Sequence, residues 1–186
     1  PCAHYGRTPP CTDLLVRSGV RRVVFASLDL DPRVAGAGLD RLRKAGIDIE
    51  HGALADDEAR MNEAYRHWQR TRRPFVTLKL ASSLDGKIAT CTGESQWITG
   101  EPARRDVHRL RNHQDAILTT ARTVCADDPA LTARVRGGRD PRRVIADSRL
   151  TTSPEARVYL PAERPPLLLT TVDDPARLAP YRARGV

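Results

Sequence analysis

The sequence is poor in the features that mark several large classes of protein. Aromatic residues make up 4% of its 186 residues. Few aromatic rings leave little for base stacking, so a dedicated nucleic-acid surface is disfavoured despite a net charge of +8. Only three of the 31 basic residues are lysines, and the arginines are interleaved with acidic residues. We therefore expect no nucleic-acid partner and attribute the positive charge to an arginine-biased composition.

Long hydrophobic runs and a cysteine framework are also missing. No apolar run approaches the ~20 residues of a membrane-spanning helix, so we expect no membrane partner. Of four cysteines, only Cys2 and Cys11 lie close together, which does not suggest a disulfide framework. No secretory signal is visible, and the cytoplasm is the expected location. The chain starts inside a motif, so we expect it to be an internal piece of a longer protein.

Residues 1–70 are predicted to alternate between helices and strands. Apolar segments bounded by glycine predict helices at 13–17 and 39–45, strands at 22–26 and 47–50, and a loop marked by Pro32, Gly36 and Gly38. A longer helix is predicted over 56–70, with a helical stripe of core residues formed by Met61, Ala64, Tyr65 and Trp68. This alternation implies a parallel or mixed sheet covered by helices.

A second α/β unit is predicted over residues 75–186. A basic segment ends at Pro74, and we place a linker at 71–74 because helices end before proline and linkers are polar. Strands are predicted at 75–81, 115–119, 142–147 and 167–171, helices at 101–112 and 174–182, and a turn at 127–129.

The first cluster of chemically informative residues is the segment Pro-Cys-Ala-His-Tyr-Gly-Arg-Thr-Pro-Pro-Cys at residues 1–11. Two cysteines beside prolines and enclosing a glycine fit a pair of thiolates held by a tight turn. Thiolates bind Zn²⁺ well, and a catalytic zinc keeps three protein ligands and one water. The third ligand is either His4 or a residue outside this chain.

This segment resembles the zinc-binding loop in the deaminase half of the bifunctional riboflavin-biosynthesis deaminase/reductase family. The resemblance implies that Cys2 and Cys11 are zinc ligands and that a zinc-bound water attacks a pyrimidine carbon bearing an amino group. The His-x-Glu pair that supplies the proton-transferring glutamate lies upstream in the family and is absent here, so this chain alone is expected not to deaminate. His4, Arg7 and Thr8 resemble substrate-side residues, and for His4 a substrate contact is favoured over a zinc ligand.

The second cluster extends over residues 74–148. It includes Pro-Phe-Val-Thr-Leu-Lys-Leu-Ala-Ser-Ser-Leu-Asp-Gly-Lys at 74–87, Gly-Glu-Ser-Gln-Trp-Ile-Thr-Gly at 93–100 and Asp-Asp-Pro at 127–129. Thr123 and Asp127 follow a predicted strand, near the edge where open α/β sheets bind ligands. Arg111 and Arg134 have the chemistry of a phosphate clamp.

This ordered set resembles the reductase domain of the same family, whose fold is similar to dihydrofolate reductase. The implied fold class is α/β, with the end of a cytidine-deaminase-like domain (1–70) followed by the start of a dihydrofolate-reductase-like domain (75–186). The resemblance implies NADPH contacts from Ala81, Trp97, Thr123, Asp127 and Ser148. It implies contacts to a pyrimidine ribosyl phosphate from Lys79, Ser95, Arg111, Leu131 and Arg134.

Three functions are compatible with these patterns. The favoured one is a riboflavin-pathway enzyme that deaminates a pyrimidine and then reduces its ribosyl group with NADPH. The second is a reductase with a vestigial deaminase half, which an intact upstream His-x-Glu would exclude. The third is an arginine-rich RNA-binding module, which salt-dependent binding to arbitrary RNA would support. The sequence does not decide between a monomer and a homo-oligomer.

Overall fold

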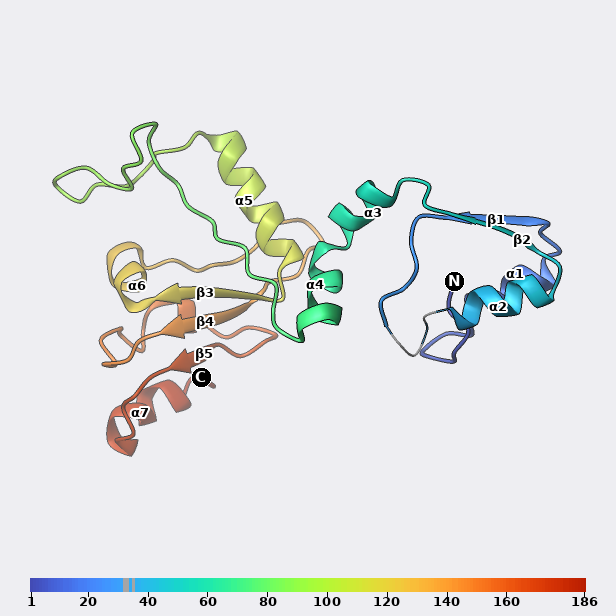
Figure 1. Cartoon of the computed structure of the whole chain (residues 1–186). Helices are drawn as coiled ribbons and strands as arrows, with labels where there is room; N and C mark the ends of the chain where they lie inside the picture. The colour runs from blue at the N-terminus through green and yellow to red at the C-terminus, as the bar shows by residue number, and fades with distance from the viewer. Residues whose placement is uncertain (32–33, 35) are drawn as a thin grey trace. The chain divides into compact units, whose positions relative to one another are not determined.

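A parallel pair of strands organises the first of two units into which the chain divides, Pro1–Lys79 and Leu80–Val186. The computed structural model describes residues 1–31, 34 and 36–186. Strands β1 (Arg22–Phe25) and β2 (Asp48–His51) pair from Arg22↔Asp48 to Phe25↔His51. Helices α1 (Cys11–Arg17) and α2 (Ala37–Lys44) lie on the same side of this pair, and α3 (Ala55–Met61) and α4 (Glu63–Thr71) follow (Figure 1).

The core of the first unit lies where α2 meets α1 and β2. Leu42 is fully buried, and Leu39 and Ile47 are nearly so, because α2 presents one apolar face to its neighbours. At Gly38 a Cβ would lie 2.0 Å from the carbonyl oxygen of Pro1. Gly38 therefore lies inside α2 as a close-approach residue, and the prediction that it belongs to a loop is wrong.

The prediction of one helix over 56–70 is wrong, because two shorter helices occupy this segment. Asn62 separates α3 from α4 with φ −106° and ψ 21°, which are not helical angles. The restart puts Met61 on a different helix from Tyr65 and Trp68, so the stripe is not continuous. Met61 is 85% exposed, and Trp68 instead lies beneath the guanidinium of Arg72, 5.9 Å from its ring centroid. The predicted core stripe is therefore largely solvent-facing.

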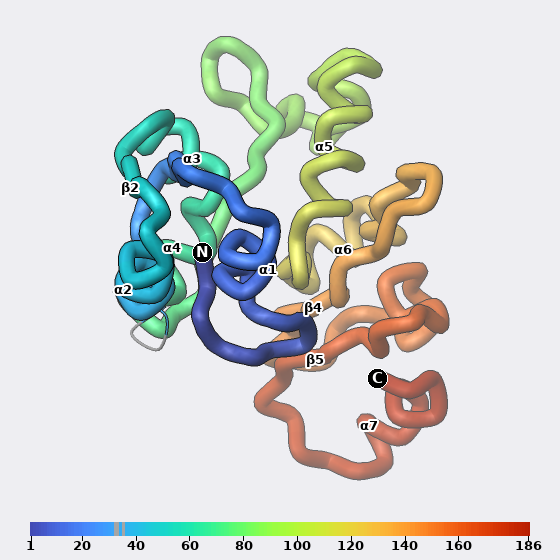
Figure 2. The backbone as a smooth tube through the Cα atoms, turned by 90° about the vertical axis from the view of Figure 1, so that its right-hand side faces the viewer, coloured from blue at the N-terminus to red at the C-terminus, as the bar shows by residue number. Residues whose placement is uncertain are grey.

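The second unit is built on a parallel sheet in the order β3-β4-β5. Its strands are β3 (Ala116–Thr120), β4 (Arg142–Ala146) and β5 (Leu167–Leu169). Helix α5 (Glu101–His113) lies on the β3 side and α7 (Pro175–Arg182) on the β5 side, and both views agree on this (Figures 1 and 2). Helix α6 (Ala121–Asp127) follows β3 directly, and the short 3₁₀ helix η1 (Arg157–Tyr159) lies between β4 and β5. The parallel α/β architecture predicted from the sequence is confirmed.

A single buried cluster holds the second unit together. Ile145 of β4 is fully buried beside Val124, Leu131, Val158, Tyr159 and Tyr181. The rings of Tyr159 and Tyr181 meet edge to face at 5.3 Å, a favoured geometry for aromatic pairs. Asp147 is buried one residue beyond β4, where its carboxylate accepts hydrogen bonds from the amides and hydroxyls of Thr151 and Thr152. These bonds fix the chain where it leaves the central strand.

Two features of the second unit differ from the sequence prediction. Residues 75–81 form no strand, because a strand needs a neighbour for its backbone groups and no described segment pairs with this one. The side chains of Val76, Leu78 and Leu80 are consequently exposed. Helix α6 was not predicted, since it is a single short segment of seven residues.

The remaining predicted helices and strands are confirmed to within two residues at each end. Asp127, predicted to begin a turn over 127–129, is instead the last residue of α6. Of the loop predicted around residues 32–38, Pro32 lies outside the described residues, while Gly36 is the N-cap residue of α2, with φ 80°. No helix in the part of the chain that the structure describes has the length and apolar character needed to cross a membrane.

Candidate functional site

Cys2 and Cys11 form a close pair at the start of α1. Their Sγ atoms lie 3.7 Å apart. The backbone N–H of Cys11 donates to Cys2 Sγ at 3.4 Å, and this bond lowers the pKa of the Cys2 thiol. The Cys2 thiol is half-buried and that of Cys11 is exposed. The two sulfurs are thus held together, and one of them is biased towards the thiolate form that binds metals.

Local packing explains why these two cysteines meet. Pro10 directs the chain into α1, and Thr12 returns to the first loop by donating its amide N–H to the Cys2 carbonyl at 3.2 Å. Thr12 is buried against Gly38, whose missing side chain lets the first loop approach α2. The carboxylate of Asp13 pairs with Arg41 of α2 at 2.7 Å. The cysteine pair therefore rests on the α1–α2 contact.

The sulfur pair matches part of a zinc site in dimension. Two thiolates on a tetrahedral zinc with ~2.3 Å bonds lie about 3.8 Å apart, close to the separation found here. Among residues 1–31, 34 and 36–186, no group of three or more His, Cys, Asp or Glu side chains is placed to hold a metal. His4, Arg7 and Thr8 are exposed on the loop between the two cysteines. The described residues therefore bring together two candidate zinc ligands, Cys2 and Cys11.

A second set of predicted residues lies at one edge of the β3-β4-β5 sheet. The register aligns Thr120, Ala146 and Leu169, so the three strands end side by side. Thr123 lies in the first turn of α6 and Asp127 at its end, and Ser148 follows β4 by two residues. The Ser148 carbonyl accepts a hydrogen bond from the Thr171 hydroxyl at 2.8 Å, which ties the ends of β4 and β5 together. Ligands bind at such carboxyl edges in open α/β sheets.

The predicted residues from the preceding loops are less enclosed. Trp97 is 70% exposed, and the Arg104 guanidinium lies over its ring at 4.6 Å. Ser95 and Ala81 are half-buried. Lys79 is exposed and ends the first unit, whereas the other predicted reductase residues belong to the second.

Arg111 and Arg134 converge on one residue, Thr132. Arg111 on α5 donates from Nη1 to the Thr132 carbonyl at 3.2 Å, and Arg134 donates from Nε to the Thr132 hydroxyl at 3.4 Å. Leu131 is buried in the core and fixes the start of this segment. The structure thus brings together three of the predicted substrate residues.

The electrostatics of this cluster favour an anion. Burial lowers the pKa of Arg111, and the nearby charge of Arg134 lowers it further. Arg111 Nε is buried and has no hydrogen-bond partner among the described residues. Two neighbouring guanidinium groups repel each other, and an anion between them would relieve that repulsion and supply acceptors.

His108 and Asp140 belong to this cluster and were missed by the sequence reasoning. His108 shares the Thr132 carbonyl with Arg111, at 3.3 Å from its Nδ1. Asp140 accepts a hydrogen bond from the Ala133 amide at 2.7 Å. The spacing of His108, Arg111 and Asn112 was an available signal, because residues at i, i+3 and i+4 share one face of a helix.

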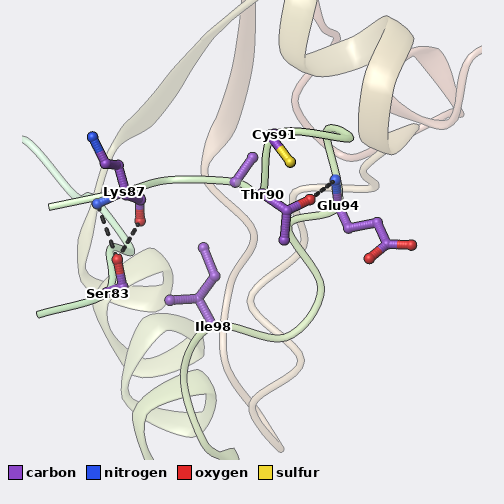
Figure 3. A pocket seen from close by; sticks show the side chains of 7 residues that line it. Ser83, Lys87, Thr90, Cys91, Glu94 and Ile98 are labelled. Carbon is purple, nitrogen blue, oxygen red and sulfur yellow. Dashed lines mark hydrogen bonds between the residues drawn. The ribbon is translucent and has the colours of Figure 1, made fainter. Parts of the chain in front are cut away.

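A pocket of about 560 Å³ lies among the loops of residues 83–98 (Figure 3). The Ser83 hydroxyl accepts from the Lys87 amide, and the Thr90 hydroxyl accepts from the Glu94 amide, so each pair closes a tight loop. Cys91 and Ile98 complete much of the lining. None of the residues predicted to contact NADPH or substrate lines this pocket.

Comparison with known proteins identifies relatives along the chain. The riboflavin biosynthesis protein RibD of Actinobacillus pleuropneumoniae is 41% identical over 100% of this chain and 50% of its own length. The RibD protein of Escherichia coli K12 is 46% identical over 85% of this chain and 47% of its own length. The chain therefore spans about half the length of these curated relatives.

Solved structures give the same result. A diaminohydroxyphosphoribosylaminopyrimidine deaminase/5-amino-6-(5-phosphoribosylamino)uracil reductase from Thermotoga maritima superposes with a TM-score of 0.84 at 40% identity, over 94% of this chain and 49% of that one. Acinetobacter baumannii RibD superposes with a TM-score of 0.82 at 38% identity, over 100% of this chain and 52% of that one. The family described as RibD C-terminal domain matches residues 74–180, more than half of the sequence, and the chain belongs to this family.

Proposed function

We propose that the full-length protein performs two consecutive steps of riboflavin biosynthesis. The first is zinc-dependent deamination of a diaminopyrimidinone ribosyl phosphate, and the second is NADPH-dependent reduction of the ribosyl group to ribityl. The observation that carries the proposal is the fold similarity to a deaminase/reductase at a TM-score of 0.84. The cysteine pair and the arginine pair are the local features that support one step each.

In the deamination step, Cys2 and Cys11 would hold the metal as thiolates. Bound zinc supplies a Lewis acid that lowers the pKa of a coordinated water to near neutrality. The Cys11 amide supports binding because it favours the thiolate form of Cys2. Arg7, exposed on the same loop, has the planar donor geometry that suits a substrate phosphate. His4 and Thr8 are proposed as further substrate contacts.

In the reduction step, the carboxyl edge of the β3-β4-β5 sheet would hold the cofactor. Bound NADPH supplies the hydride that reduces the open-chain ribosyl carbon. We assign cofactor contacts to Ala81, Trp97, Thr123, Asp127 and Ser148. We assign substrate contacts to Lys79, Ser95, Arg111, Leu131 and Arg134. The arginine pair orients the substrate by its phosphate, which lies away from the reacting carbon and binds by charge.

The same proposal divides the chain by function. Residues 1–70 would be the end of a cytidine-deaminase-like domain, residues 71–74 a linker, and residues 75–186 the start of a dihydrofolate-reductase-like domain. The contact-based division after Lys79 and the family match from residue 74 both support a boundary in this region.

The proposal is tested on the full-length protein by measuring zinc content, ammonia release and NADPH oxidation. We expect about one deaminase zinc per chain and both activities with the phosphorylated substrate. Reduction without zinc or ammonia release would favour a reductase with a vestigial deaminase half. Absence of both activities, together with salt-dependent RNA binding, would overturn the proposal in favour of an RNA-binding module.

A further inference from the structure

Residues 131–140, here called the strap, form an irregular segment held against α5. Two of its non-glycine residues adopt left-handed backbone angles, Leu131 with φ 55° and Arg134 with φ 53°. Such angles are unfavourable for side chains with a Cβ and persist where surrounding contacts enforce them. The strap therefore owes its shape to its anchors.

Residues on one face of α5 hold the strap at two points, the carbonyl of Thr132 and the amide of Arg139. The Thr132 carbonyl accepts from His108 Nδ1 at 3.3 Å and from Arg111 Nη1 at 3.2 Å. Asn112 Oδ1 accepts from the Arg139 amide at 2.8 Å, further along the strap. Because the partner of His108 is a carbonyl, its Nδ1 must carry the hydrogen.

Asp140 supplies a third anchor from within the strap. Its carboxylate accepts from the Ala133 amide at 2.7 Å, across seven residues. Ala133 is itself buried, so both its burial and the bond from its amide N–H to Asp140 hold the backbone between Thr132 and Arg134. Arg134 follows directly, and its guanidinium returns to the Thr132 hydroxyl.

We propose that His108 and Asp140 are positioning residues that fix the strap so that Arg134 stands beside Arg111 before substrate arrives. This inference rests on the proposed role of the two arginines in binding the substrate phosphate. Two guanidinium groups held side by side repel each other until an anion binds between them. Before the ligand arrives, the strap must therefore be held in place by residues that do not contact the ligand. His108 and Asp140 meet that need because both bond the strap backbone rather than an arginine side chain.

The test compares variants at position 108 in the full-length enzyme. His108→Ala removes the donor to the Thr132 carbonyl and should raise KM for the phosphorylated substrate about tenfold, the loss that corresponds to one hydrogen bond. Because the cofactor site is at the sheet edge, NADPH affinity should stay unchanged and kcat should fall less than KM rises. His108→Asn carries an amide N–H close to the position of Nδ1 and should recover most of the loss, whereas His108→Gln should not.

Two further variants complete the design. Asp140→Asn keeps an acceptor for the Ala133 amide and should bind substrate nearly as well as wild type, whereas Asp140→Ala should raise KM as His108→Ala does. His113→Ala, on the exposed side of α5, is the matched control and should change nothing. Competition by inorganic phosphate should weaken in His108→Ala and Asp140→Ala in proportion to KM.

Three results would overturn the inference. They are an unchanged KM in His108→Ala, equal recovery by the Asn and Gln variants, or a loss of NADPH binding parallel to the rise in KM, which would make His108 a general folding residue. Arg111→Ala separates this inference from the proposed function. If that variant keeps its preference for phosphorylated substrate, the arginine pair is not the phosphate site. If it loses the preference while His108→Ala keeps it, only the positioning role fails.

Discussion

At the scale of single residues, charge and burial identify the side chains with the most specific tasks. Arg111 is half-buried beside Arg134. Its burial and the positive charge of Arg134 both lower the pKa of Arg111, so the arginine pair favours an anionic ligand. Asp147 shows the opposite arrangement, a buried anion surrounded by donors. The arginine pair predicts selectivity for a phosphorylated substrate, and Asp147 predicts a contribution to the free energy of unfolding that depends on pH.

Arg111→Ala should remove most of the preference for phosphorylated over dephosphorylated substrate. Losing a charge-assisted hydrogen bond costs about 1.5–3 kcal/mol, which is roughly ten- to a hundredfold in affinity. Arg111→Lys should recover only part, because an ammonium group lacks the planar fork of guanidinium. The measurement is kcat/KM for both substrate forms. An equal preference in wild type and Arg111→Ala would move the phosphate site to another residue, and Arg134→Ala would be tested next.

Asp147→Asn should destabilise the second unit at neutral pH and much less in acid. Burial raises the pKa of Asp147, but hydrogen bonds from Thr151 and Thr152 outweigh it and leave the pKa below its ordinary value. A lowered pKa means that the ionised group stabilises the fold above about pH 4 and that this contribution disappears as pH falls through the folded-state pKa. Urea unfolding of wild type and Asp147→Asn at pH 7 should differ by about 2–3 kcal/mol.

The difference between the two proteins should narrow as the pH is lowered below 4, roughly the ordinary pKa of an aspartate. Asp173→Asn, at an exposed position beyond β5, serves as the control and should unfold like wild type at every pH. A difference that stays constant with pH would show that the charge of Asp147 is not what stabilises the turn.

At the scale of helices and strands, local sequence signals predicted where each element lies better than they predicted which segments pair with one another. Gly19 and Gly46 correctly marked the ends of α1 and α2, because glycine adopts the positive φ that ends a helix. The alternation over 75–81 indicated which side chains are apolar, but alternation does not specify a neighbouring strand. Asn62 breaks the helix without glycine or proline, so the pattern gave no warning.

The sequence likewise predicted some residues of the candidate site but not the contacts that hold them together. Arg111 and Arg134 were predicted as a clamp from their chemistry and family resemblance, and the structure places both on Thr132. His108 was missed because a single histidine on a helix is ordinary, and its importance depends on a loop residue 24 positions away. Its spacing from Arg111 and Asn112 indicated a shared face of α5, but that spacing does not reveal which loop the face contacts.

Gly38→Ala tests the contact between α2 and the loop that carries Cys2. The added Cβ would lie 2.0 Å from the Pro1 carbonyl oxygen, so α2 must shift away from the loop. Such overpacking costs about 1–3 kcal/mol and should loosen the cysteine pair. The measurements are the urea midpoint and the rate of zinc loss to a chelator in the full-length protein. Lys44→Ala, exposed on the same helix, should match wild type in both, and identical behaviour of Gly38→Ala would show that the contact is dispensable.

At the scale of the whole molecule, the chain combines two units, and no residue is assigned to both the proposed deamination site and the proposed reduction site. The cysteine pair lies in Pro1–Lys79, and the arginine pair and the sheet edge lie in Leu80–Val186. Lys79 is the one assigned reductase residue outside the second unit. The account therefore predicts that each activity can be removed while the other remains.

The most direct test of this central claim is to measure ammonia release and NADPH oxidation separately in the same preparations of full-length wild type, Cys11→Ser and Arg111→Ala. NADPH oxidation is assayed on the already deaminated substrate, so that the two steps are independent. The account predicts that Cys11→Ser loses zinc and ammonia release but keeps reduction, and that Arg111→Ala keeps zinc and ammonia release but reduces its substrate about ten- to a hundredfold less efficiently. A Cys11→Ser protein that keeps its zinc and deaminates, or an Arg111→Ala protein that reduces normally, would contradict it.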